Sequence, residues 1–210
     1  MKPWLFAVLL ACLAWPLAAQ ERAAHQVVEK GIEALTLAFE EHQQNFEEQP
    51  DALYQALSDA MQPYVDFRYI SARVMGGRYF RAATPEQRSR FARVFQDTLV
   101  RTFGQGLMNF DYREFDLRFR ETASRHENQQ SVELEVIAAD GQRYPVIFTL
   151  RYHNDEWKVI NLIVNGVNLG LTFNSQFDRA MREHRRDFDK VIDNWSPDAA
   201  LEELQEEAEV

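Results

Sequence analysis

Apolar residues change their spacing once along the chain, near residue 109. Before that point they recur at three- and four-residue steps, the period of one helix face, and beyond it they alternate with polar residues, the period of a strand. The pattern predicts an α+β fold in which a helical N-terminal half packs on a twisted antiparallel sheet of about four strands, followed by C-terminal helices.

Several helices are predicted in the first half. Residues 23–46 form a long helix with one apolar stripe, made of Val27, Val28, Ile32, Leu35 and Phe39. A second helix covers about 51–61, between two prolines, and residues 64–80 form a helical stretch broken at Gly76-Gly77.

The next helix has the clearest start signal in the chain. Thr84 opens a capping box that Gln87 completes, Pro85 occupies the first turn, and the helix runs to about Leu107. Its apolar side is rich in aromatic residues from Phe91 to Phe103. We therefore expect a large apolar surface to cover this helix.

The segment 114–164 has the alternation of a four-stranded meander, with turns at Asp140-Gly141 and 153–156. The last strand, 157–164, is apolar on both faces after its first residues, which predicts that both its sides are dry. The chain then turns into a helix with one apolar stripe, made of Leu171, Phe173, Phe177, Ala180 and Met181. Asp187 is expected to cap a last helix that ends at Trp195.

The N-terminus has the order of a secretory signal peptide: Lys2, a short apolar run to Trp15, and small residues before Gln20. A bilayer-spanning helix needs about 20 apolar residues, so cleavage after Ala19 is preferred over an anchor. The alternative of a lipoprotein cleavage box ending at Cys12 leaves a signal of only about 11 residues.

The expected domain plan follows from that cut. Residues 1–19 are the leader, 20–198 a single domain, and 199–210 an acidic tail. Within the domain, 20–108 is the helical half, 109–165 the sheet and 166–196 the C-terminal helices. The only cysteine lies in the leader, so the exported chain has no thiol for a disulfide or for catalysis.

The charge of the chain excludes some partners. Its formal net charge is −10, and loss of Lys2 with the leader makes it −11. Nucleic acid is not expected as a partner, because phosphates require a basic footprint. Arg68, Arg73, Arg78 and Arg81 form a local basic cluster, which is either a solvated helix face or a surface for an acidic partner or a lipid phosphate.

Motifs of common enzyme and metal sites are absent from the sequence. No two of the five histidines have a metal-ligand spacing, and there is no G-x-S-x-G elbow, P-loop or zinc pattern. Gly104-Gln105-Gly106 lacks the third glycine of a nucleotide fingerprint and is interpreted as a helix end. We predict no catalytic residue, no metal and no cofactor.

Several segments have the pattern of a known family: 63–69, 74–88, 144–146, the strand 157–164 and the turn Asn165-Gly166-Val167-Asn168-Leu169. In these segments the chain resembles the MlaC family of periplasmic phospholipid-binding proteins of the maintenance-of-lipid-asymmetry pathway, also called the toluene-tolerance auxiliary family. The resemblance covers nearly the whole exported chain, from about residue 24 to 195.

The resemblance implies a non-enzymatic periplasmic carrier that shuttles phospholipid to maintain outer-membrane lipid asymmetry. Its partners would be an outer-membrane lipoprotein–porin complex and an inner-membrane ABC transporter with a lipid-binding ring. The sheet and helices would enclose an apolar pocket for the acyl chains and leave the head group outside. Two other readings stay open: a periplasmic protein-binding adaptor or chaperone, and an enzyme with a cone-shaped fold.

Candidate lipid contacts are apolar residues at the ends of the predicted elements. They are Phe103, Leu107, Val146, Phe148, Leu150, Ile163, Val164, Val167 and Leu171. For each of them ordinary core packing is the alternative. Because strand neighbours point to opposite faces, Ile163 and Val164 are not both expected to contact lipid unless the strand twists there.

Overall fold

A computed structural model describes residues 4–108, 114–120 and 128–197, with side chains from Ala23 onward. The helices are α1 (Trp4–His42), α2 (Pro50–Met61), α3 (Phe67–Ala82), α4 (Pro85–Leu107), α5 (Leu169–Glu183) and α6 (Phe188–Asp193), with a short 3-10 helix η1 (Gln43–Asn45) after α1. The strands are β1 (Asp116–Arg120), β2 (Gln129–Ile137), β3 (Arg143–His153), β4 (Glu156–Val164) and β5 (Val167–Asn168).

The first helix differs from its predicted bounds at both ends. It begins at Trp4, within the predicted leader, and it stops at His42 instead of Phe46. The backbone then tightens into η1, a common way for a helix to end, and the Phe46 ring packs edge-on against Tyr54 of α2 at 5.8 Å, ring centre to ring centre.

Leader cleavage stays a prediction, and the acidic tail 199–210 lies outside the described residues. Among the described helices, none is long and apolar enough to cross a membrane.

The strands form one antiparallel meander in the order β1-β2-β3-β4-β5, which confirms the predicted sheet class. The described residues contain five strands, because β5 folds back on the end of β4 and pairs Val167 with Val164. Asn165 and Gly166 both have positive φ, 48° and 89°, as a two-residue hairpin turn requires. The Asn-Gly signal therefore makes a hairpin before the helix and not a direct turn into it.

A β-bulge explains part of the long apolar run in β4. Thr149 pairs with Asn161 and Leu150 with Val159, so Ile160 is the extra residue of the bulge. The bulge puts Leu162 on the same face as Val159, whereas strict alternation would put them on opposite faces. Val159, Leu162 and Val164 thus lie on one face, and Asn161 lies on the other face beside Thr149, which corrects the interpretation that both sides of the strand are equally dry.

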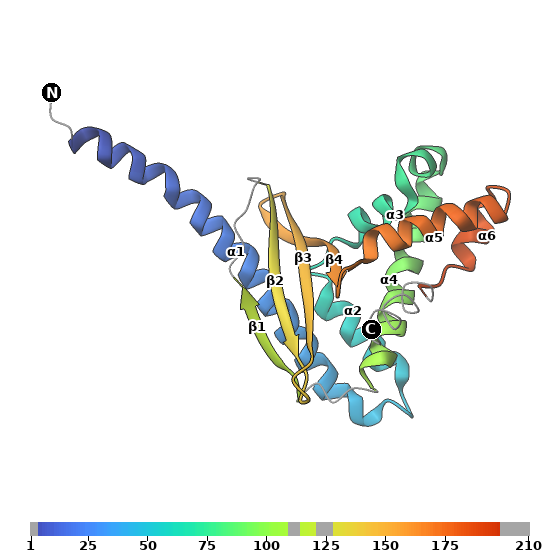
Figure 1. Cartoon of the computed structure of the whole chain (residues 1–210). Helices are drawn as coiled ribbons and strands as arrows, with labels where there is room; N and C mark the ends of the chain where they lie inside the picture. The colour runs from blue at the N-terminus through green and yellow to red at the C-terminus, as the bar shows by residue number, and fades with distance from the viewer. Residues whose placement is uncertain (1–3, 109–113, 121–127, 198–210) are drawn as a thin grey trace.

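Three apolar clusters hold the layers together. In the first, Ala24 and Val28 of α1 pack on Val132, Leu150 and Trp157 of the sheet. The second lies between α1, α2 and α4, and the third joins α3, α4, α5 and α6. Figure 1 shows α1 lying across the sheet while α3 to α6 gather beyond β4.

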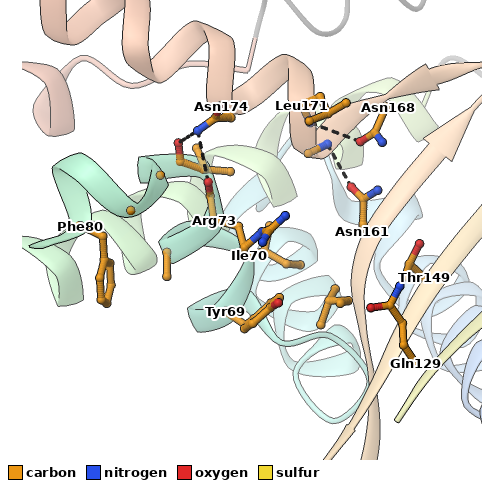
Figure 2. Close-up of a pocket in the computed structure, with 16 residues that line it drawn as sticks. Tyr69, Ile70, Arg73, Phe80, Gln129, Thr149, Asn161, Asn168, Leu171 and Asn174 are labelled. Carbon is orange, nitrogen blue, oxygen red and sulfur yellow. Dashed lines mark hydrogen bonds between the residues drawn. The ribbon is translucent and has the colours of Figure 1, made fainter. Parts of the chain in front are cut away.

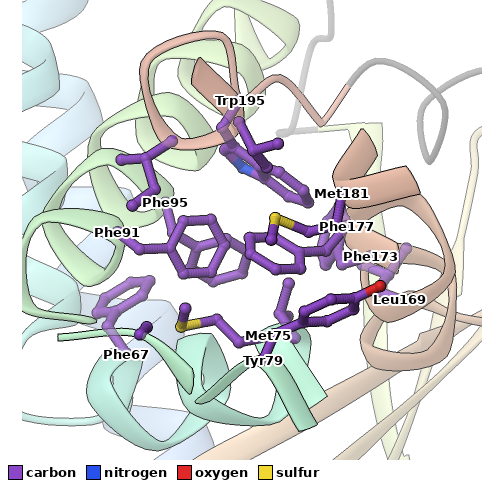
Figure 3. Close-up of a cluster of buried hydrophobic side chains, with 14 of the residues drawn as sticks. Phe67, Met75, Tyr79, Phe91, Phe95, Leu169, Phe173, Phe177, Met181 and Trp195 are labelled. Atoms are coloured by element: carbon purple, nitrogen blue, oxygen red, sulfur yellow. The ribbon is translucent and has the colours of Figure 1, made fainter. Parts of the chain in front are cut away.

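The third cluster is aromatic and covers the first half of α4. Phe91 and Phe95 are fully buried, and the Phe91 ring lies 4.8 Å from Phe177 and 5.3 Å from Trp195, ring centre to ring centre (Figure 3). Such tilted and edge-on contacts add to the hydrophobic gain of burial. The expectation that a large apolar surface covers α4 is confirmed, and α5 with the Trp195 segment supplies it.

Local signals place the helix starts where they were predicted. At α4 the Thr84 hydroxyl accepts from the Gln87 N–H and the Gln87 side chain accepts from the Thr84 N–H, which completes the capping box. Asp187 caps α6 through the Lys190 N–H. In α3 the helix kinks at Gly76, whose φ of 70° and ψ of 155° are accessible only to glycine.

Gly76→Ala should lower the free energy of unfolding by about 1–3 kcal/mol, because alanine is strained at this backbone conformation and its Cβ would lie 3.0 Å from Asn174 Nδ2. The control is Gly106→Ala in α4, where a Cβ meets nothing within 4 Å. That change should raise stability by about 0.5–1 kcal/mol. Urea unfolding of both variants measures the difference, and equal effects would contradict the kink assignment.

A buried hydroxyl joins α3 to α5. Tyr79 donates to Asp178 at 2.9 Å, and its burial, with help from that hydrogen bond, raises the pKa of Tyr79. The native state thus holds this proton more tightly than the unfolded chain does. The resulting stability is complete below the ordinary tyrosine pKa of 10.0 and is lost as the pH rises through the native value.

Tyr79→Phe should therefore lose less stability than the unmodified protein when the pH is raised from 8 to 11. At pH 8 the variant should itself be less stable by about 1 kcal/mol, through the lost hydrogen bond. Urea midpoints across this pH range test both statements. Tyr144→Phe is the control, since no hydrogen bond of the Tyr144 hydroxyl occurs among the described residues; parallel pH curves for Tyr79→Phe and the unmodified protein would refute the assignment.

Candidate functional site

An apolar cavity of about 300 Å³ lies between the helical half and the sheet. Helices α1, α2 and α4 contribute Val27, Val28, Gly31, Ile32, Leu35, Leu57, Met61, Phe95, Leu99, Val100, Phe103, Gly104 and Leu107. The sheet, α5 and the 64–70 segment contribute Tyr64, Val65, Phe67, Ile70, Phe148, Val159, Asn161, Leu162, Leu169, Gly170 and Phe173. Asn161 and the Tyr64 hydroxyl are the polar side-chain groups in this lining.

The cavity lies where the three apolar clusters meet. Val28 belongs to the cluster between α1 and the sheet, Leu57 to the α1–α2–α4 cluster, and Phe173 to the aromatic cluster. Gly104 lets α4 approach α2 closely, since a Cβ there would lie 3.0 Å from Leu57 Cδ1. Phe91 thus packs in the aromatic cluster, Phe95 belongs to both that cluster and the cavity lining, and the last turns of α4 line the cavity.

A second cavity of about 630 Å³ opens between α3, the start of α5 and the sheet (Figure 2). It is called the polar cavity below because it has more polar side chains than the first, although Ile70, Phe80 and Ile160 also line it. Its polar lining comes from Tyr69, Arg73, Gln129, Thr149, Asn161, Asn168 and Asn174. No aspartate or glutamate is among the described residues that line it. Among the described residues, Arg73 makes no ion pair.

The two cavities are neighbours. Ile70, Asn161 and Gly170 line both of them, so one layer of residues forms the wall between them. The Asn161 Oδ1 accepts from the Gly170 N–H at 3.1 Å, and Gly170 has no space for a side chain, because a Cβ would lie 2.4 Å from that oxygen. This contact closes the wall beside the first turn of α5.

Three of the residues proposed from sequence line the apolar cavity: Phe103, Leu107 and Phe148. Val146 and Ile163 line neither cavity. Ile163 pairs with Ile147 and Val164 with Val146, on opposite faces of β4 as expected. The role of all the proposed residues as lipid contacts remains a prediction.

The remaining proposed residues lie in the cores or at the polar cavity. Leu150 is fully buried against α1, Val167 is buried in the aromatic cluster, and Val164 packs against that cluster. Leu171 lines the polar cavity and is 64% exposed. It does not share the buried stripe of α5 formed by Phe173, Phe177 and Met181, because it lies in the first turn, on the side facing away from the aromatic cluster.

Sequence reasoning missed the contribution of α1 and α2 to the lining. The apolar stripe of α1 was identified, but apolar spacing shows that a face is covered and not whether a side chain or a void covers it. Asn161 was also missed as a wall residue. Its one available signal was a polar side chain within an otherwise apolar strand end.

Comparison with known proteins places the chain in a family. The sequence model of the MlaC protein family matches residues 29–197. The toluene tolerance protein ttg2D of Pseudomonas putida is 35% identical over 194 residues, which is 92% of this chain and 88% of that protein. The intermembrane phospholipid transport system binding protein MlaC of Haemophilus influenzae is 23% identical over 176 residues, 80% of this chain and 81% of that one.

A solved structure has the same fold. The phospholipid-binding protein from Ralstonia solanacearum, determined in complex with a phospholipid, superposes with a TM-score of 0.68 at 19% sequence identity. The match covers 88% of this chain and 96% of that protein. With the family match over most of the described fold, the conclusion is that this chain belongs to the MlaC family.

Proposed function

We propose that this protein is a periplasmic phospholipid carrier that holds acyl chains in the apolar cavity. The observation that carries the proposal is an internal cavity whose lining is apolar apart from Asn161 and one tyrosine hydroxyl. Burial of a methylene group in such a site is worth about 0.8 kcal/mol, so a lipid tail gains affinity from its length alone. The names of the two relatives, with toluene tolerance and intermembrane phospholipid transport, support the same assignment.

The carrier would load and unload at two membrane complexes, an outer-membrane lipoprotein–porin complex and an inner-membrane ABC transporter with a lipid-binding ring. Outer-membrane lipid asymmetry would be maintained by that traffic. The proposal requires no covalent chemistry. The described residues that line the apolar cavity include no carboxylate or histidine that could act as acid or base, which favours a carrier over a cone-shaped enzyme.

Loading must widen the apolar cavity. Its volume of about 300 Å³ is at the lower end of the range of about 300–1,000 Å³ for ligand pockets, and a diacyl lipid is a large ligand. The backbone has positive φ at the Gly76 kink in α3 and in the Asn165-Gly166 hairpin turn, which lie beside the helical half and at the end of the sheet. We propose both as hinges that let the helical half move away from the sheet.

Native mass spectrometry on the protein purified from periplasm without detergent tests the function. We expect a stoichiometric mass increment that lipid extraction identifies as diacyl phospholipid. A lipid-free protein that also fails to take up phospholipid from added vesicles would exclude the carrier function. The adaptor or chaperone function would then be the better explanation, since it needs no bound lipid.

Phe103→Arg should abolish lipid uptake, because it places a charge in the apolar cavity at a cost of several kcal/mol. Phe103 is only partly buried, so the fold should survive. Leu37→Arg, at an exposed position of α1 outside the cavity lining, is the matched control and should bind lipid normally. Uptake of a fluorescent phospholipid, with circular dichroism on both variants, gives the comparison; normal uptake by a folded Phe103→Arg protein would place the lipid elsewhere.

A further inference from the structure

We propose that four exposed arginines at the junction of α3 and α5 dock the protein on an anionic bilayer surface. They are called the arginine surface below and are Arg78 and Arg81 of α3, with Arg185 and Arg186 of the turn after α5. None of them lines either cavity, so the surface is separate from the site proposed for the acyl chains. The inference goes beyond the proposed function and rests on it in one respect, since a phospholipid carrier has to approach bilayers.

The arginine surface gathers around the contact between α3 and α5. Arg78 and Arg81 are three residues apart on α3 and therefore lie on the same helix face. The Tyr79 hydroxyl donates to Asp178 of α5, and Arg78 and Arg186 both lie close enough to this tyrosine for their charges to act on it. Figure 1 shows α3, α5 and α6 together at one end of the molecule, away from β1.

Two of the four arginines occupy a backbone conformation that favours glycine. Helix α5 ends in a turn in which the Arg186 N–H donates to the Met181 carbonyl at 2.7 Å. The Arg185 N–H donates to the Arg182 carbonyl at 3.2 Å. This turn needs a left-handed residue directly after the helix, and that residue is usually glycine.

The same turn has a left-handed backbone at both arginines, with φ of 53° at Arg185 and 65° at Arg186. Long side chains rarely adopt such angles, and residues held in them concentrate at functional sites. Glycine at either position would remove the strain. The chain therefore keeps two cations where its backbone alone favours glycine.

The charge of the arginine surface is available to a partner. None of its four guanidinium groups makes an ion pair with a described residue, whereas the neighbouring Arg182 pairs with Asp178. From 179 to 186 the sequence has four arginines and one acidic residue, Glu183. An acidic protein would need carboxylates at positions that match both a helix and a turn. Lipid head groups diffuse laterally and gather under cations at any spacing, so an anionic bilayer fits this surface better.

The chemistry of arginine also suits phosphate head groups. Its guanidinium fork matches the geometry of phosphate oxygens, and each cation near an anionic bilayer adds to the attraction. Salt limits this attraction to short distances. Acidic residues elsewhere on the protein therefore repel the bilayer little once the arginine surface faces it.

Sedimentation with phospholipid vesicles tests the surface. The purified full-length protein is mixed with vesicles of phosphatidylcholine alone, or of equal parts of phosphatidylcholine and phosphatidylglycerol. The unmodified protein should bind the anionic vesicles at least about tenfold more tightly. Added salt should reduce this preference, because it screens the charges.

The double variant Arg185→Gly with Arg186→Gly should weaken binding to the anionic vesicles at least about tenfold, because it removes two cations. Its thermal midpoint should rise, because glycine adopts the backbone angles of this turn without strain. The two measurements move in opposite directions, so a loss of fold would not explain weaker binding.

The charge-matched control is Lys30→Gln with Arg118→Gln, which removes two exposed cations from α1 and β1. It should bind the anionic vesicles as the unmodified protein does. The docking surface would be overturned by equal binding of the unmodified protein to both kinds of vesicle, by unchanged binding of the glycine variant, or by an equal loss in the control. An acidic protein would then be the better partner for these arginines.

Uptake of a short-chain fluorescent phospholipid, added without vesicles, separates this inference from the carrier function. Such uptake needs no docking on a bilayer, so the glycine variant should take up the lipid normally. Loss of uptake in that variant would place the arginines in the lipid-binding site and overturn their role as a separate surface. Failure of the unmodified protein to take up the lipid would overturn the carrier function, whereas failure of vesicle binding alone would overturn only the docking surface.

Discussion

The burial of the first half of α4 in the aromatic cluster is the constraint on which the rest of the structure depends. Phe91 and Phe95 are locked against Phe177 and Trp195, so α4 has a fixed position before its last turns reach the sheet. Those turns continue along the same axis and hold Phe103 at the cavity.

The cavity is therefore a product of competing packing demands. Protein interiors normally close voids, since atoms lining an empty space lose van der Waals contacts. Here the void lies between three clusters of buried side chains. Movement of any one cluster into the void would open a gap behind it. The fold thus keeps an internal space between its clusters.

Sequence signals were sufficient where structure is local. Thr84 and Asp187 cap their helices through atoms three residues away, and the Asp140-Gly141 turn depends on its own backbone angles. They were insufficient where the environment comes from distant segments. Leu150 and Phe148 are apolar neighbours on one strand face, yet one is fully buried against α1 and the other borders a void. Both side chains are large and apolar, so the sequence does not distinguish their environments. The packing of α1 and α4 does.

The polar cavity was the part least accessible to sequence. Its asparagines are residue types that usually occur in turns and caps, and Asn168 does cap α5. They line the cavity because backbone N–H groups of Gly170 and Leu171 hold their oxygens. That arrangement depends on β4 and α5 meeting at Gly170, 9 residues along the chain from Asn161.

The arginines of α3 also affect how the protein approaches a charged partner. From Phe67 to Pro85 the chain has no acidic residue, while its total formal charge is −10. The segment that contains α3 is thus a positively charged stretch of an acidic chain. At physiological ionic strength the field of exposed charges reaches only about 8 Å, so it acts during the last step of an encounter. Within that distance α3 attracts an anionic partner.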